Sequence, residues 1–392
     1  MNKLVLMIAT AVTLNLNAQK PLTTSPLEVF GDHTFIQLSV DGSRPLNFIF
    51  DTGDGLTVID TDIALELKLQ LDHSSKKTSA QGSIEGSLIK HNYIEMSGFR
   101  LESDIEVYAT SLKHLEISIG QNIDGIIGYD LLQHYAVVLD GLNKQMKIFK
   151  PGEYKYGGFG EKYTLDFEQY IPFISATVTL NNGEKFQGNY FVSTGAGTTL
   201  DFNSKFAKKN DVAAKTGDHY SYLVKGLGNT ETLHYEGRVQ DFKIGKLHFE
   251  NLPVGISEAK HGIQANKKMD GIIGNRILKN YIVIFDYENR SMFLERYIGT
   301  RDEFHVNACG FEVQLADDMK KVLIHRIYEI GPASDQGIQV NDELVEINGT
   351  PVSEMTLPEI VRQLNKGGET VDIKISSFGR ERTISLKLEE LI

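Results

Sequence analysis

The chain of 392 residues contains no tryptophan and a single cysteine. Because Cys309 has no partner within the chain, no disulfide framework stabilises this protein. The sequence also lacks an excess of positive charge: 52 Asp and Glu against 40 Lys and Arg give a formal net charge of −12, which disfavours a nucleic-acid partner. The eleven histidines show no His-Glu-x-x-His spacing, and no Gly-x-x-x-x-Gly-Lys phosphate loop occurs. We therefore expect no metal and no cofactor.

Long apolar runs are also missing, except at the start of the chain. Lys3 precedes a mainly apolar stretch over 4–16, and Asn17-Ala18-Gln19 supplies a small residue at its end. This order is typical of a secretory signal peptide, and the run is too short to span a bilayer as a helix. We expect residues 1–18 to be a signal peptide, the protein to be secreted or periplasmic, and no transmembrane segment to remain after its removal. A buried N-terminal strand or helix is the alternative.

What the sequence does contain is an internal repeat. Residues 124–140 and 270–286 both begin Asp-Gly-Ile-Ile-Gly and align without a gap at an offset of 146 residues. Further upstream, the Phe-Ile-Phe-Asp-Thr-Gly segment at 48–53 matches the Tyr-Phe-Val-Ser-Thr-Gly segment at 190–195, at an offset of 142 residues. The same segments in the same order, at nearly equal spacing, indicate a duplicated lobe.

Both copies have the composition of β structure. Short β-branched or aromatic runs alternate with Gly, Asn and Asp turns, and helical patterns are confined to brief stretches such as 62–69 and 203–209. Residues 150–158 are rich in Gly, Lys and Tyr and are typical of a linker. We predict one mainly β lobe over 27–150 and a second over 160–296.

The pattern changes after about residue 304. We predict a strand at 322–327, a turn with a short helix at 331–337, and a strand closed by a turn at 342–349. Apolar residues at 357–364 recur at helical spacing, and two strands complete the chain. This order predicts a small α+β domain over 304–392.

The repeated segments carry a family resemblance. Asp51-Thr52-Gly53 follows an apolar strand, and an Ile-Ile-Gly segment occurs later at 126–128. This pairing resembles the active-site motifs of aspartic proteases, and its duplication resembles the two lobes of a pepsin-like or fused retropepsin-like enzyme. The resemblance covers residues 27–296. It implies a two-lobed, mainly β acid-protease fold that binds a peptide or protein substrate in the cleft between the lobes.

In that family two facing carboxyls share a proton and activate the water that attacks the peptide bond. The resemblance implies that Asp51 is one of them, but Ser193 occupies the position of the second. A serine hydroxyl can bind a water but cannot take its proton at ordinary pH, and the sequence alone does not separate a natural serine from an introduced one. Asp54 is a second departure, and its charge would raise the pKa of Asp51 if the two side chains lie close together. The active-site turns would be completed by Thr52, Gly53, Thr194 and Gly195.

Two further sites follow from resemblance. Gly82, Ser83, Gly226 and Gly228 lie where aspartic proteases have a flap, with ordinary hairpin turns as the alternative. The C-terminal domain resembles a PDZ domain, most specifically over 331–352. Gly310 and Phe311 lie where that family has its carboxylate-binding loop, which implies a groove for a chain terminus or an extended peptide. A domain that only packs against the lobes is the alternative.

Three functions remain open. The first is an aspartic-type endopeptidase in which Asp51 is the essential carboxylate. The second is a catalytically degenerate homologue that binds peptide without cutting it, and the third is a homodimer that pairs Asp51 from two chains. Asp201 lies near the second turn, but it aligns beside Ile59 and Asp60 and not with Asp51, so it is not a catalytic candidate. Cys309 is expected to be a buried packing residue.

Overall fold

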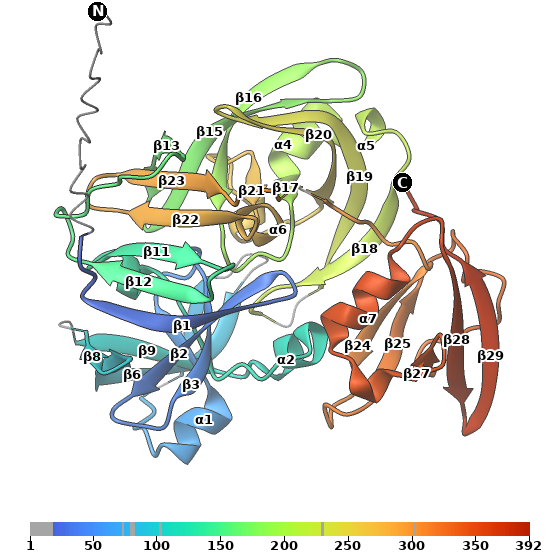
Figure 1. Cartoon of the computed structure of the whole chain (residues 1–392), viewed down its shortest axis with the longest axis horizontal. Coiled ribbons are helices and arrows are strands. Elements are labelled where there is room, and N and C mark those ends of the chain that lie inside the picture. Colours follow the sequence, from blue (N-terminus) through green and yellow to red (C-terminus); the bar gives the residue numbers. More distant parts are fainter. Residues whose placement is uncertain (1–18, 73, 79–82, 102–103, 229–230, 301–302) are drawn as a thin grey trace, which may run out of the picture.

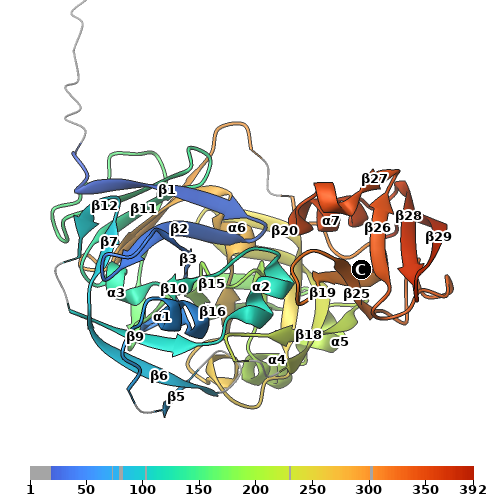
Figure 2. The ribbon, with the colours of Figure 1, turned by 90° about the horizontal axis from the view of Figure 1, so that it is seen from below.

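A computed structural model describes residues 19–72, 74–78, 83–101, 104–228, 231–300 and 303–392. The protein is mainly β, as the sequence predicts, with two lobes and a C-terminal domain that lies to one side of them (Figures 1 and 2). The predicted signal peptide lies outside the described residues. Within the described part of the chain, no helix has the length and apolar character needed to cross a membrane.

Lobe 1 consists of twelve strands and three short helices in the described residues. They are β1 (Thr23–Phe30), β2 (His33–Val40), β3 (Leu46–Phe50), β4 (Thr57–Asp60), α1 (Thr61–Glu66), β5 (Ser74–Thr78), β6 (Ser83–Asn92), β7 (Ile94–Met96), β8 (Phe99–Arg100), β9 (Ile105–Thr110), α2 (Lys113–Ile119), β10 (Gly125–Ile127), α3 (Tyr129–Leu132), β11 (Ala136–Asp140) and β12 (Gln145–Phe149). Helix α1 is shorter than predicted, because the left-handed backbone of Lys68 (φ 58°) does not allow it to continue.

Lobe 2 repeats this order after a segment without helix or strand, which is the predicted linker. Its elements are β13 (Glu161–Thr164), β14 (Asp166–Glu168), β15 (Ile171–Thr179), β16 (Lys185–Val192), β17 (Leu200–Phe202), α4 (Ser204–Asn210), α5 (Val212–Lys215), β18 (Tyr220–Lys225), β19 (Glu231–Ile244), β20 (Leu247–Ser257), the 3₁₀ helix η1 (Ile263–Ala265), β21 (Gly271–Ile273), α6 (Asn275–Leu278), β22 (Tyr281–Asp286) and β23 (Ser291–Arg296).

The strand register shows that the lobes are true repeats. In lobe 1, β3 pairs in parallel with β10, and Phe50 lies opposite Ile127. In lobe 2, β16 pairs in parallel with β21, and Val192 lies opposite Ile273. The central strands β10 and β21 also pair antiparallel with β4 and β17, respectively. Each central strand thus has a neighbouring strand on both edges, which explains why its sequence is apolar.

A shared sheet joins the lobes across an approximate two-fold axis. Strands β11 and β22 pair antiparallel, and Val138 lies directly opposite Ile284, its counterpart 146 residues later. Equivalent residues can pair in this way only where the axis passes between them. Buried side chains of both lobes form one continuous core, which includes Val137 and Phe285. The two lobes therefore fold as one unit.

The C-terminal domain has its own core and sheet. Its elements are β24 (Phe311–Leu315), β25 (Val322–Ile327), β26 (Glu343–Ile347), β27 (Thr350–Pro351), the 3₁₀ helix η2 (Val352–Glu354), α7 (Leu357–Leu364), β28 (Thr370–Ser377) and β29 (Arg380–Lys387). The sheet order is β24-β25-β26-β28-β29, which leaves β24 at an edge. Helix α7 begins at a capping box formed by Thr356 and Glu359.

One predicted helix of this domain is wrong. Residues 331–337 form successive turns, in which Ser334 N–H donates to Gly331 O and Gln336 N–H to Ala333 O. Gly331 (φ 98°) and Gly337 (φ 64°) are left-handed, so only a few residues between them could be helical. The backbone hydrogen bonds of this segment join residues three positions apart, as in turns, and not four apart, as in an α-helix.

Candidate functional site

The two repeated turns face each other at the centre of the protein. Asp51 follows β3 and Ser193 follows β16, and each backbone N–H donates to the central strand of its own lobe, at 2.9 Å from Ile127 O and Ile273 O respectively. The hydroxyl of Ser193 donates to Asp51 Oδ1 at 3.1 Å. The structure therefore brings Asp51 and Ser193 together, as the paired offsets in the sequence indicate.

Three donors bind one oxygen of the Asp51 carboxyl. Oδ1 accepts from Gly53 N–H at 2.8 Å, from Gly195 N–H at 3.2 Å and from the Ser193 hydroxyl. A Cβ at position 195 would lie 2.1 Å from Asp51 Cγ, so only glycine allows the second turn to approach this closely. Because no donor in the described part of the chain binds Oδ2, that oxygen is free for a water or a substrate.

The pKa of Asp51 lies above its ordinary value. Burial is the main cause, because a carboxylate in a low-dielectric site loses its hydration, and the negative charge of Asp54 raises the pKa further. The hydrogen bonds from Gly53, Ser193 and Gly195 act in the opposite direction. Asp51 therefore stays protonated up to a higher pH than an exposed aspartate does.

The two threonines brace the turns reciprocally. Thr52 Oγ1 donates to Val192 O at 2.5 Å and accepts from Thr194 N–H at 3.2 Å. Thr194 Oγ1 donates to Phe50 O at 2.8 Å and accepts from Thr52 N–H at 3.1 Å. Both side chains are fully buried. Each lobe therefore supplies the hydrogen bonds that the other lobe's turn needs.

The residues assigned to a flap lie at hairpin tips. Gly226 and Gly228 follow β18 at the tip of the β18–β19 hairpin, and Ser83 begins β6 of the β5–β6 hairpin, whereas Gly82 lies outside the described residues. The β18–β19 tip reaches lobe 1: His114 Nε2–H on α2 donates to Gly226 O at 3.0 Å. The side chain of Leu227 packs against an apolar cluster of lobe 1.

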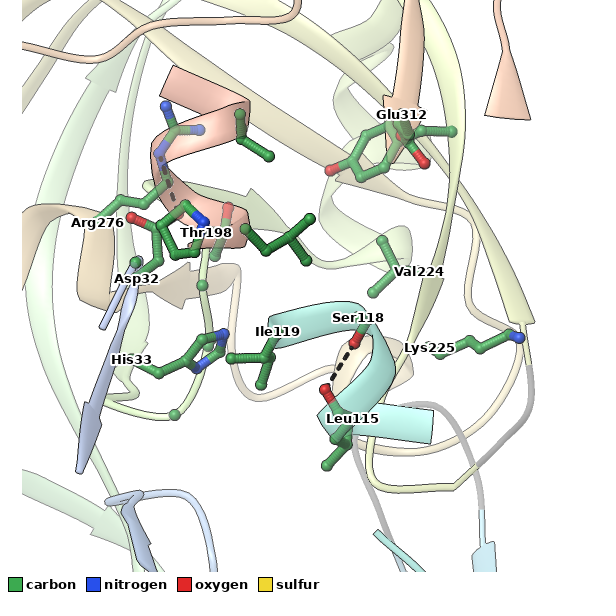
Figure 3. A pocket seen from close by; sticks show the side chains of 18 of the residues that line it. Asp32, His33, Leu115, Ser118, Ile119, Thr198, Val224, Lys225, Arg276 and Glu312 are labelled. Carbon is green, nitrogen blue, oxygen red and sulfur yellow. Dashed lines mark hydrogen bonds and ion pairs between the residues drawn. The ribbon is translucent and has the colours of Figure 1, made fainter. Parts of the chain in front are cut away.

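A continuous cavity of about 1320 Å³ connects these parts. Its lining includes Asp51 and Ser193 as well as residues of β24 and α7 in the C-terminal domain. Figure 3 shows Leu115 and Ile119 of α2, Val224 of β18 and Glu312 of β24 around it. The interlobe cleft and the edge of the C-terminal domain thus share one space.

Helix α2 lines this cavity and packs against β24. A Cβ at Gly120, which ends the helix with a left-handed backbone, would lie 2.6 Å from Leu357 Cβ at the start of α7. The sequence prediction missed α2. The spacing of Leu112, Leu115 and Ile119 before Gly120 is the signal that could have found it.

Gly310 and Phe311 lie at the start of the edge strand β24, as the resemblance implies. The side chain of Asn307 already occupies their hydrogen-bonding groups: Oδ1 accepts from Gly310 N–H at 2.8 Å, and Nδ2 donates to Phe311 O at 2.7 Å. The carboxamide of Asn307 thus bonds to both residues that the resemblance assigns to peptide binding. The sequence gives no indication of this contact.

Other predicted residues have structural roles. Cys309 is 1 % exposed, and burial raises its pKa to about 12, which makes the thiol unreactive. No group of His, Cys, Asp or Glu side chains in the described part of the chain could hold a metal ion. The structure also corrects the alignment of Asp201: it lies opposite Ile272, as Val58 lies opposite Ile126, so its counterpart in lobe 1 is Val58.

The threonine bracing can be tested by a change that keeps the side-chain shape. Thr194→Val removes the donor to Phe50 O and the acceptor of Thr52 N–H in a buried site, so we expect a loss of about 2–3 kcal/mol in the free energy of unfolding. Urea denaturation measures this loss. Thr164→Val on β13, where the side chain is exposed, is the control and should change stability by less than about 0.5 kcal/mol. Equal effects of the two variants would contradict the bracing role.

The raised pKa of Asp51 predicts a pH-dependent stability. The folded state binds this proton more tightly than the unfolded chain, so the stabilisation is complete below the unfolded pKa and is lost as the pH rises through the folded pKa. Asp51→Asn should therefore raise the melting temperature at pH 7, by roughly 2–4 °C, and should have little effect below about pH 4. Calorimetry across this range measures it, with the exposed Asp218→Asn as control. A destabilised Asp51→Asn protein at pH 7 would contradict the assignment.

Comparison with protein families agrees with this geometry. A family model described as aspartyl protease matches residues 36–131, which include the Asp51 turn and the Ile-Ile-Gly segment of lobe 1. A model described as PDZ domain matches residues 302–376. A comparison with curated proteins finds no match. The chain thus combines an aspartyl protease-like domain with a C-terminal PDZ domain, and the first of these supports a protease-type hydrolase at a coarse level.

Proposed function

We propose that this protein is an aspartic-type endopeptidase that binds an extended peptide between its two lobes, with Asp51 as the acid–base group. The observation that carries the proposal is the burial of one carboxyl between two repeated turns. Its Oδ1 is held by donors from both lobes, and it lines a cavity of about 1320 Å³. The β18–β19 tip, which reaches α2 across the cleft, supports a flap role for Gly226 and Gly228.

The chemistry follows from the two facing side chains. Asp51 Oδ2 takes a proton from a water as its oxygen attacks the carbonyl carbon, and the proton then passes to the leaving amine nitrogen. The carbonyl oxygen gains negative charge in this step and needs a donor. Ser193 can give a hydrogen bond but, unlike a second carboxyl, no proton. We therefore expect slow hydrolysis from the chain with Ser193.

Two alternatives rest on the same site. A degenerate homologue that binds peptide without cutting it is favoured by the missing second carboxylate. A homodimer that pairs Asp51 of two chains is disfavoured, because the Ser193 turn of the same chain already occupies the facing position and bonds Asp51. We also propose that the protein acts in a secreted or periplasmic setting, on the basis of the signal-like sequence of residues 1–18.

Restoring the second carboxyl tests the proposal. Ser193→Asp should raise the cleavage rate by about a hundredfold or more, because a positioned acid–base group contributes about 10²–10⁴-fold. The rate should then follow a bell-shaped pH profile, since the two carboxyls share one proton. Cleavage of a mixed peptide library between pH 4 and 8, followed by mass spectrometry, measures both effects.

The matched control is Ser193→Asn, which has the shape of aspartate but no ionisable group and should give no gain. Asp51→Asn should abolish the activity of the unmodified protein and of the Ser193→Asp variant. Cleavage that is indifferent to Asp51, or a folded Ser193→Asp protein with no gain on any peptide, would show that the proposal is wrong.

The PDZ domain has a second candidate ligand site, at the free edge of β24. We infer that an extended chain end with an apolar last residue binds there, since Phe311 and Leu364 are among the residues that line the cavity. Asn307 occupies the same hydrogen-bonding groups in this structure and would have to be displaced.

Asn307→Ala should therefore increase the affinity for such a peptide by about two- to tenfold. This is the range expected when the peptide no longer competes with a side chain for one or two hydrogen bonds. Fluorescence anisotropy with a labelled decapeptide ending in leucine measures the affinity, and the same peptide with an amidated end is the control. Unchanged affinity in Asn307→Ala would contradict the competition. No binding to either protein would favour a PDZ domain that only packs against the lobes.

A further inference from the structure

The two lobes differ in chemistry at equivalent positions. In lobe 1, Val58 lies opposite Ile126 on the central strand, and in lobe 2, Asp201 lies opposite Ile272. Two residues beyond each position, Asp60 caps α1 and Asn203 caps α4, which confirms that the register is equivalent. A buried aspartate thus stands in lobe 2 where lobe 1 has a buried valine.

The strands next to these two positions, β9 in lobe 1 and β20 in lobe 2, also differ in the residue that they place there. Val58 lies beside Tyr108 on β9, and both belong to an apolar cluster that packs against Leu115 and Ile119 of α2. Asp201 lies beside Gly255 on β20. A Cβ at position 255 would lie 1.9 Å from Asp201 Oδ1, so the glycine leaves the space that the carboxylate occupies.

Asp201 is close to the catalytic turn and reaches the cavity. It pairs with Ile272, the residue before Ile273, whose carbonyl accepts the N–H of Ser193. Asp201, Ile272 and Ser193 all line the cavity. A substrate side chain that enters the lobe 2 half of the cleft next to the catalytic turn therefore meets this carboxylate.

The carboxylate of Asp201 is buried, and no lysine or arginine in the described part of the chain pairs with it. It is 6 % exposed, and among the described residues its hydrogen-bond donors are two neutral groups, Thr198 Oγ1 at 2.8 Å and Gln264 Nε2 at 3.3 Å. His234 Nδ1 lies 3.8 Å away, but burial lowers the pKa of His234 and favours the neutral ring. Glu236, in the same cavity, differs because Arg276 lies 3.9 Å from it.

An unpaired buried charge is costly, and a cation from a ligand would compensate it. Each carboxylate oxygen accepts about two hydrogen bonds and uses one here, so an ammonium or guanidinium group could bond both oxygens.

We propose that Asp201 determines specificity: the lobe 2 half of the cleft accepts a lysine or arginine side chain of an extended substrate, while the lobe 1 half accepts an apolar one. The inference rests on the proposed peptide-binding function of the cleft and names its substrate class. The asymmetry also fixes the direction in which a peptide lies across the approximate two-fold axis, because only one orientation places the basic side chain in lobe 2.

The test uses the full protein and two families of fluorescein-labelled decapeptides. Each peptide of the first family contains one lysine and, toward its other end, one leucine, and the position of the lysine differs from peptide to peptide. In the second family norleucine replaces the lysine. The two side chains have similar length and differ in charge. Both binding, by anisotropy, and cleavage are measured, for the unmodified protein and for its Ser193→Asp variant.

We expect a preference of about tenfold or more for lysine at one position. Asp201→Asn, which keeps the shape, should abolish the preference, and Asp201→Val, which gives lobe 2 the residue of lobe 1, should reverse it. Glu250→Gln removes one negative charge from an exposed side chain of the same lobe, on β20, and should leave the preference unchanged. Thermal denaturation checks that each variant is folded.

The outcomes separate this inference from the proposed hydrolysis. Lysine-selective binding that depends on Asp201, without cleavage by either protein, would support the inference and contradict the endopeptidase. Equal binding of the two families, a preference that survives Asp201→Val, or no binding of any peptide would overturn the inference, whether or not peptides are cut.

Discussion

The mutual burial of two turns is the constraint on which this molecule depends. Asp51 takes one hydrogen bond from its own lobe, through Gly53, and two from the other lobe, through Gly195 and Ser193. The paired threonines lie beneath and tie each turn to the opposite strand. Neither lobe can build this site alone. The shared sheet and continuous core of the lobes are what hold the two turns at hydrogen-bonding distance.

The repeat made the fold and the centre of the site predictable. A duplicated segment order implies a two-fold axis, and the offsets place Asp51 against Ser193 before any contact is known. The strand at 322–327 and the helix at 357–364 agree with the structure to the residue, because apolar periodicity and strong caps mark them. These features depend on residues that are close together in the chain, so a single sequence is enough to predict them.

The remainder depends on contacts between distant segments. Ser193 and Asp201 are eight positions apart, whereas Asp51 and Val58 are seven, so one extra residue in the lobe 2 turn shifts the equivalence, and only the strand register reveals it. The sequence does not indicate the role of the Asn307 carboxamide, because its bond to Phe311 O depends on how β24 lies beside it. Helix α2 was missed because it is short and is supported by β24 and the β18–β19 tip, neither of which is near it in sequence.

The most direct test of the account is the binding of a statine-type peptide, a transition-state analogue of aspartic proteases, measured by calorimetry. Such analogues bind tightly only where the catalytic group contacts the tetrahedral centre. We predict saturable binding to the unmodified protein that weakens by about tenfold or more in Asp51→Asn and strengthens in Ser193→Asp. Binding with the same affinity in all three proteins, or none even in Ser193→Asp, would contradict a peptidase site built on Asp51.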